Sequence, residues 1–207
     1  KKKLSLSTTQ IIMLSFFGMI LLGSLLLSLP ISSADGNPVP YLDALFTATT
    51  ATCVTGLVTV PTVSTWSVFG QVVILILIQI GGLGVITIIS AVMILLHKRM
   101  GLGNRLLLQD AFNLNSFSGI IRFVKRVLWG TFLVEGIGAL LYMIVFVPEF
   151  GPRGVWAAAF TSISAFCNAG FDIFGVLNPG ASLMEFQSDP VVLLTLGTLV
   201  IVGGLGF

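Results

Sequence analysis

Four long apolar runs constrain the fold of this chain more than any other feature. Residues 67–96 contain no Asp, Glu, Lys or Arg over 30 positions. Residues 11–29 and 127–147 form two further runs, the second interrupted only by Glu135, and 191–207 form a fourth. A helix that crosses a bilayer needs about 20 predominantly apolar residues. The first three runs are therefore predicted to be transmembrane helices, and the fourth to be a transmembrane helix that is cut short.

The composition points to the same solvent. Of the 207 residues, 56% are hydrophobic and 9% are charged, whereas a soluble domain carries about 25% charged residues. The run at 11–29 follows three lysines, as in a signal peptide, but it is longer than the about 7–15 apolar residues of such a signal, and no small-residue cleavage site follows it. We therefore expect an all-α integral membrane protein whose first run is a mature helix.

Basic residues are distributed unevenly between the loops. Nine of the ten lie before the first run or between the second and third, and only Arg153 lies elsewhere. Lys and Arg are enriched in cytoplasmic loops. The N-terminus and the loop 97–126 are therefore predicted to be cytoplasmic, and the segments 30–66 and 148–190 to be outside, in a protein that crosses the cell membrane several times.

Acidic residues show the opposite bias. Six of them fall in the two outer segments: Asp35, Asp43, Glu149, Asp172, Glu185 and Asp189. Negative charge around a pore entrance would raise the local cation concentration. Ordinary solvation of loops explains the same bias equally well, so both interpretations stay open.

The two outer segments contain a repeat. Residues 46–57 (FTATTATCVTGL) align without a gap with 160–171 (FTSISAFCNAGF), and a Gly-Gly-Leu-Gly match follows each copy, at 81–84 and 203–206. Each copy is predicted to be a helix, an outer loop with a short helix and a tight turn, and a second helix. Two spans return the chain to the same side, so the copies are parallel.

These copies divide the chain into two predicted units. The first unit covers 1–126 and includes the cytoplasmic linker 97–126, and the second covers 127–207 and is truncated in its last helix.

A short helix is predicted before each Cys-x-x-Gly turn. The Asn-Pro-Val-Pro stretch at 37–40 blocks a helix, so one is expected over 41–52, and its counterpart over 154–166. About ten helical residues span roughly 15 Å, which is half of the bilayer core. A helix of this length cannot cross the membrane, so we expect each to be a re-entrant pore helix.

The chain after each pore helix must turn back, and its carbonyl groups cannot face lipid. Lining an aqueous pore would let them replace the hydration shell of a cation, as in potassium channels. The predicted selectivity filter consists of Val54, Thr55, Gly56, Asn168, Ala169 and Gly170. In this interpretation the carbonyls of Val54, Thr55, Asn168 and Ala169 coordinate K+, and Gly56 and Gly170 permit the turn.

The paired turns and the Gln79-Ile80-Gly81-Gly82-Leu83-Gly84 segment resemble the Trk/Ktr/HKT potassium transporters, and most closely the bacterial Ktr membrane subunit. The resemblance covers essentially the whole chain. It implies potassium uptake, often sodium-dependent, by a homodimer bound to a cytoplasmic nucleotide-binding regulatory ring. It also implies four units per chain, so the 207 residues are expected to be a fragment with two of the four.

Other features have more than one interpretation. Cys53 and Cys167 have no His or acidic residue nearby in sequence, so packing is favoured over a metal site or a disulfide. Glu135 is expected to contact a pore helix or loop, and the conduction path is the less favoured place for it. The Gly81-Gly82-x-Gly84 cluster is either a close-packing site or a flexible point in the helix, with packing favoured.

Two other functions were weighed against potassium conduction. A pore for another small solute also uses half-helices, but typically in inverted repeats, and a non-conducting membrane scaffold would need neither the glycines nor the outer acids. No hydrolase, kinase or metal-binding pattern is present in the sequence, and nothing in it indicates a nucleic-acid partner or a bound cofactor. We therefore expect a non-enzymatic protein whose only ligand is the transported ion.

Overall fold

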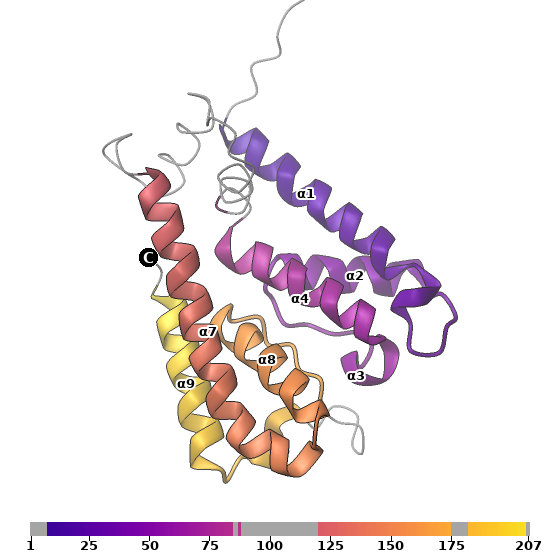
Figure 1. Ribbon diagram of the computed structural model, residues 1–207. Coiled ribbons are helices and arrows are strands. Elements are labelled where there is room, and N and C mark those ends of the chain that lie inside the picture. The colour runs from indigo at the N-terminus through magenta and orange to yellow at the C-terminus, as the bar shows by residue number, and fades with distance from the viewer. Residues whose placement is uncertain (1–7, 85–86, 88–119, 175–181, 206–207) are drawn as a thin grey trace, which may run out of the picture.

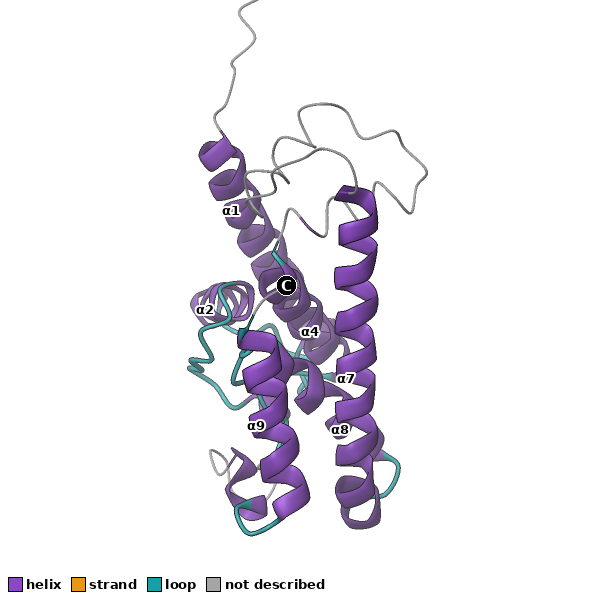
Figure 2. Ribbon diagram, turned by 90° about the vertical axis from the view of Figure 1, so that its left-hand side faces the viewer, coloured by secondary structure: helices purple, strands orange, loops and turns teal. Residues whose placement is uncertain are grey.

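The computed structural model describes residues 8–84, 87, 120–174 and 182–205. In these ranges helices are joined by loops, and one isolated bridge links Ser33 and Trp66 (Figure 2). The helices are α1 (Thr8–Leu27), η1 (Pro30–Ser32), α2 (Tyr41–Thr52), α3 (Thr62–Thr65), α4 (Val68–Leu83), α7 (Ile120–Phe150), α8 (Arg153–Phe166), η2 (Ser182–Phe186) and α9 (Pro190–Gly204). The all-α prediction is confirmed for these residues.

The helices pack in two groups (Figure 1). The first consists of α1, α2 and α4, and the second of α7, α8 and α9. In each group the short helix, α2 or α8, lies against both of the longer helices. The groups meet where α4 packs against α8, so α4, the second long helix of the first group, lies at the seam between them.

The sequence explains where several of these helices begin. Pro40 immediately precedes α2 and Pro152 immediately precedes α8, and proline disfavours a helical residue before it. Asp189 caps α9, because its Oδ1 accepts the backbone N–H groups of Val191 at 2.8 Å and Val192 at 3.1 Å. Ser67 caps α4 in the same manner, through the N–H of Gly70 at 3.2 Å.

The two short helices predicted from the repeat are confirmed as α2 and α8, within one residue of the expected bounds. The apolar run 67–96 differs from the prediction, because its helix ends at Leu83 where Gly84 takes φ +81°. Apart from Thr87, the rest of that run lies outside the described residues, as does the linker up to 119. The third run extends in both directions into α7, whose first turns carry Arg122, Lys125 and Arg126.

One helical segment is long and apolar enough to cross a membrane within the described ranges: Arg122–Phe150, with 29 residues and a mean hydropathy of 2.0. Three shorter apolar segments accompany it: Ile12–Leu27, Val68–Leu83 and Pro190–Gly204. Large apolar side chains are exposed along three helices: Met13, Phe17 and Leu25 on α1, Trp129, Leu140 and Ile144 on α7, and Leu194 and Ile201 on α9. Apolar surface of this extent is consistent with a membrane protein.

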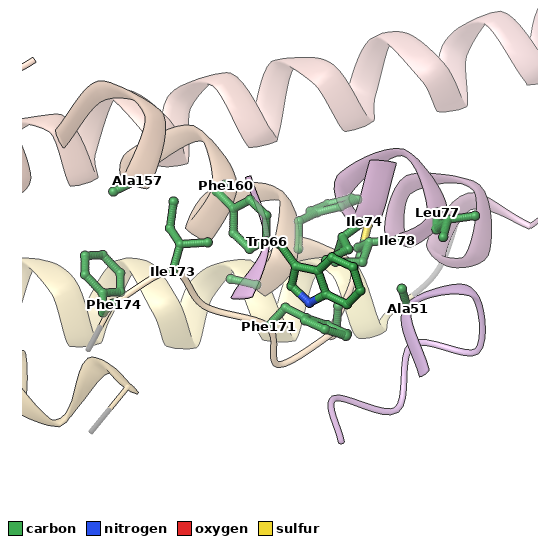
Figure 3. Close-up of a cluster of buried hydrophobic side chains, with 14 of the residues drawn as sticks. Ala51, Trp66, Ile74, Leu77, Ile78, Ala157, Phe160, Phe171, Ile173 and Phe174 are labelled. Carbon is green, nitrogen blue, oxygen red and sulfur yellow. The ribbon is translucent and has the colours of Figure 1, made fainter. Parts of the chain in front are cut away.

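A shared hydrophobic core joins the two groups (Figure 3). Trp66, Ile74 and Ile78 of the first group and Phe160 and Phe171 of the second belong to one buried cluster. Phe171 directly follows Gly170 of the second turn, so the core fixes the chain just beyond that turn. Leu57, the aligned residue of the first copy, is instead 63% exposed.

Candidate functional site

The first Cys-x-x-Gly turn is a defined helix ending. Cys53 caps α2 and donates its N–H to the carbonyl of Thr49 at 2.8 Å. The next two N–H groups, of Val54 and Thr55, donate back to the carbonyls of Ala51 at 3.4 Å and Thr50 at 3.0 Å. This pair of bonds is the Schellman pattern, which ends a helix and reverses the chain.

The second turn has the same hydrogen bonds at the aligned positions. Cys167 donates to the carbonyl of Ile163 at 2.9 Å. The Schellman pair then runs from Asn168 to Ala165 at 3.0 Å and from Ala169 to Ser164 at 2.8 Å. Sequences that differ at Val54-Thr55 and Asn168-Ala169 therefore adopt one backbone conformation.

Left-handed backbone angles occur at matching positions in the two turns. Val54 has φ +55° and Asn168 has φ +57°, and two residues later Gly56 has φ +76° and Gly170 has φ +69°. Asparagine tolerates this region, whereas a β-branched residue such as valine is an outlier there. Holding a non-glycine residue in this way costs about 1–3 kcal/mol, so the surrounding contacts must fix both turns.

The two turns touch each other at their glycines. A Cβ built on Gly56 would lie 2.7 Å from the carbonyl oxygen of Ala169 and 3.3 Å from the Cα of Gly170. A Cβ built on Gly170 would lie 3.4 Å from the Cα of Gly56. The predicted filter residues of the two copies are therefore neighbours in space, although 114 positions separate them in the sequence.

Exposure differs among these six residues. Thr55, Asn168 and Gly170 are exposed, Val54 and Gly56 are half-buried, and Ala169 is fully buried.

A hydroxyl group braces each turn, and sequence reasoning missed this role. Ser164 Oγ donates to the carbonyl oxygen of Phe171 at 2.6 Å. In the first copy the aligned Thr50 Oγ1 accepts the N–H of Leu57 at 2.9 Å and lies 2.6 Å from Thr55 Oγ1. The signal was present in the alignment, since both copies carry a hydroxyl at this position.

Removing one brace has a measurable consequence. Ser164→Ala leaves the Phe171 carbonyl without its side-chain donor, and we expect the full-length protein to lose about 0.5–1.5 kcal/mol of unfolding free energy. Thermal unfolding in detergent measures the loss. Ser188→Ala, at an exposed serine, is the control and should unfold as the unsubstituted protein does. Equal unfolding of both variants would exclude the brace.

Glycines of α4 and α9 pack onto the C-terminal ends of the short helices α2 and α8. A Cβ on Gly81 would clash with the carbonyl of Thr52, and a Cβ on Gly203 would clash with the carbonyl of Phe166. Gly82 similarly accommodates Cys167, whose Sγ would lie 2.6 Å from a Cβ there. Of the two interpretations of the Gly81-Gly82 pair, the structure therefore shows close packing.

The cysteines are free thiols in different surroundings. Cys53 is exposed, and Cys167 is buried against α4. Within the residues that the structure describes, no group of three or more His, Cys, Asp or Glu side chains could hold a metal ion. The packing role expected for the cysteines is confirmed for Cys167.

Glu135 lies inside the helical bundle, with 4% of its surface exposed. Its Oε1 accepts a hydrogen bond from Gln79 Nε2 at 2.9 Å, and its backbone carbonyl accepts one from Ser162 Oγ of α8 at 2.6 Å. Ser162 belongs to α8, so Glu135 contacts the short helix of the second group, the one that the sequence predicts to be a pore helix.

The sequence as a whole decides the family. It matches the family described as "TrkH: Cation transport protein" over residues 4–207. The chain belongs to this family. The resemblance noted from the turns is therefore confirmed, and membership of this family shows that the chain is not an enzyme.

Three relatives of this TrkH-family chain are all named as potassium or potassium/sodium uptake proteins. The potassium/sodium uptake protein NtpJ of Enterococcus hirae is 41% identical over 203 residues, which is 98% of this chain and 44% of that protein. The Ktr system potassium uptake protein B of Bacillus subtilis is 43% identical over 199 residues, 96% of this chain and 43% of that protein. Its namesake in Vibrio alginolyticus is 39% identical, over 96% of this chain and 42% of that protein. The chain thus spans less than half the length of these relatives.

Some of the acids predicted to lie outside have local structural partners. Asp172, two residues after Gly170, accepts the N–H of Phe174 at 3.1 Å and the hydroxyl of Ser182 at 2.6 Å. Asp189 caps α9, and Asp43 lies in the first turn of α2, where a negative charge is favourable. Local structure therefore accounts for part of the acidic bias of the two segments that contain these residues.

Proposed function

We propose that this chain supplies two pore-loop units of a potassium-uptake protein, with the Cys-x-x-Gly turns as two walls of its selectivity filter. The single observation that carries the proposal is the contact between the turns at Gly56 and Gly170. Two turns with one backbone conformation, meeting at their glycines, are the arrangement that repeated filter walls require. The names of the relatives, potassium or potassium/sodium uptake proteins, support the choice of ion.

The backbone chemistry at the turns suits a cation. The helix-ending bonds of the first turn use the carbonyls of residues 49–51 as acceptors. The carbonyls assigned to K+, those of Val54 and Thr55, come later in the chain and are not acceptors of these bonds. The same holds for Asn168 and Ala169 after α8. Both short helices also end at these turns, and a helix C-terminus carries about half a negative charge. Carbonyls and helix ends together would offset the loss of water around the ion.

The chain would lie in the cell membrane, with the N-terminus and the linker 97–126 in the cytoplasm and the turns facing outside. The first unit covers 1–126 and the second 127–207. The full protein would have four such units and form a homodimer that binds a cytoplasmic nucleotide-binding ring. The relatives named as parts of a Ktr system support a partner of this kind, and the potassium/sodium relative supports a role for Na+.

Growth of a potassium-uptake-deficient strain tests the proposal. The full-length protein should restore growth at low external K+, and cells that express it should take up K+ faster than Na+ and should take up no glycerol. A membrane-localised protein that fails to restore growth would support the scaffold alternative. Glycerol uptake equal to K+ uptake would support a pore for neutral solutes.

A further inference from the structure

The end of α4 touches both turns. Gly81 packs against the Thr52 carbonyl and lies near Val54, whose Cγ2 would be 3.0 Å from a Cβ on that glycine. The next residue, Gly82, packs against Cys167 of the second turn. One short helical segment therefore lies behind the two turns, which meet at Gly56 and Gly170.

A polar contact accompanies this packing one turn earlier on α4. The Cys167 thiol donates to Gln79 Oε1 at a sulfur–oxygen distance of 3.9 Å, and Gln79 Nε2 donates to Glu135 Oε1 at 2.9 Å. Glu135 is in turn bonded through its backbone to Ser162 of α8. Gln79 thus connects α4 with α7 and with the turn that ends α8.

The Gln79 amide is oriented by two partners. Its NH2 end donates to Glu135 Oε1, and its carbonyl end accepts from the Cys167 thiol. The arrangement occurs once in the described part of the chain. Counting from the two Gly-Gly-Leu-Gly matches, the counterpart of Gln79 in the second unit is Ile201, which is 63% exposed.

We propose that Gln79 is a positioning residue that holds the second filter turn in register with the first, so that discrimination between K+ and Na+ depends on it. This inference rests on the proposed function, because it presumes that the turns select the ion. Gln79 does not touch the ion in this account. It acts through Cys167, while Gly82 leaves room for that side chain.

A second glutamine of α4 offers a matched control. Gln71 accepts a hydrogen bond from Trp156 Nε1 at 2.7 Å and donates to the Trp66 carbonyl at 3.1 Å. It bridges the same seam between α4 and α8 through a side-chain bond of similar length. Trp156, however, lies in the first turn of α8, at the end opposite to the Cys167 turn.

The test compares two double variants of the full-length protein in proteoliposomes. Gln79→Leu/Glu135→Leu removes both partners of the 2.9 Å bond, so neither the amide nor the carboxyl group is left unpaired, and only the weakly donating Cys167 thiol loses its acceptor. We expect it to fold and to lose discrimination between K+ and Na+ by about tenfold. Gln71→Leu/Trp156→Phe should keep the discrimination of the unsubstituted protein. The ratio of the two ion fluxes is independent of protein yield, so a purely structural role would not change it.

Unchanged discrimination in the first variant would overturn the inference, and so would an equal loss in both. If the first variant does not fold, Glu135→Gln is measured in its place. The new amide can both accept and donate hydrogen bonds, so the Gln79 amide is free to flip. We expect discrimination between K+ and Na+ to fall about threefold, and unchanged discrimination would overturn the inference. If the unsubstituted protein conducts no K+, the proposed function itself fails, and this outcome is distinct from the others.

Discussion

Gly56→Ser is expected to lower the potassium-over-sodium discrimination of the full-length protein by about tenfold or more. The residue has φ +76°, which costs a side-chain-bearing residue about 1–3 kcal/mol, and at this position the strain is relieved next to the proposed ion site. A change of about 1.4 kcal/mol in the relative binding of the two ions corresponds to a factor of ten. The new Cβ would also lie 2.7 Å from the Ala169 carbonyl oxygen. Because that carbonyl is one of the proposed K+ ligands, its displacement alters the site itself. Ion flux measured separately for K+ and Na+ in proteoliposomes gives the ratio.

Gly36→Ser is the control for this experiment. Gly36 has nearly the same angle, φ +72°, but nothing lies within 4 Å of a Cβ built there. The backbone strain is therefore similar, while the contact with the other turn is missing. Gly36→Ser should keep the discrimination of the unsubstituted protein. A Gly56→Ser protein that discriminates equally well would remove Gly56 from the filter.

Gly203→Ala is expected to abolish most of the folded yield. The added methyl group would clash with the carbonyl oxygen of Phe166 and would lie 2.8 Å from its carbonyl carbon and 3.3 Å from its Cα. All three atoms belong to the backbone, so no change of rotamer relieves the overlap. Overpacking of a tight core costs about 1–3 kcal/mol, and contact with backbone places this variant at the upper end or beyond. Size-exclusion chromatography and thermal unfolding in detergent measure the effect.

Gly197→Ala provides the comparison on the same helix. Nothing lies within 4 Å of a Cβ at Gly197, and alanine is the better helix former by about 1 kcal/mol. Its yield should equal or exceed that of the unsubstituted protein. If Gly203→Ala were as stable as Gly197→Ala, α9 would not pack against the end of α8 as described.

The short helices could be predicted from sequence because their boundaries have local causes. Prolines precede α2 and α8, and a repeated Cys-x-x-Gly follows each. The glycines of the turns were also predictable, since Gly56 and Gly170 occupy the same position in two otherwise different copies. Such signals depend on neighbouring residues, and a repeat presents each of them twice.

The end of α4 was not predictable in the same way. The apolar run continues without a break through Gly84 to residue 96, and glycine is common in membrane helices. Only the backbone angle of Gly84, φ +81°, shows that the helix ends at Leu83. Hydrophobicity alone does not distinguish a helix that continues from one that stops.

Contacts between the two groups of helices also could not be predicted from the sequence. Gln79 and Glu135 are 56 positions apart, and neither residue type indicates the other as its partner. The expectation that Glu135 would contact a pore helix came from the free energy of placing a charge in a membrane, which requires some protein partner without naming one. The left-handed conformation of Val54 likewise contradicts its local preference, so the fold must impose it.

The position of bound ions tests the central claim most directly. Crystals of the full-length protein grown in Rb+, which replaces K+ and scatters anomalously, should show a peak beside the two touching turns. We expect it to be bounded by the backbone carbonyl oxygens of Val54, Thr55, Asn168 and Ala169. Rb+ bound only at sites away from these carbonyl oxygens would contradict the account.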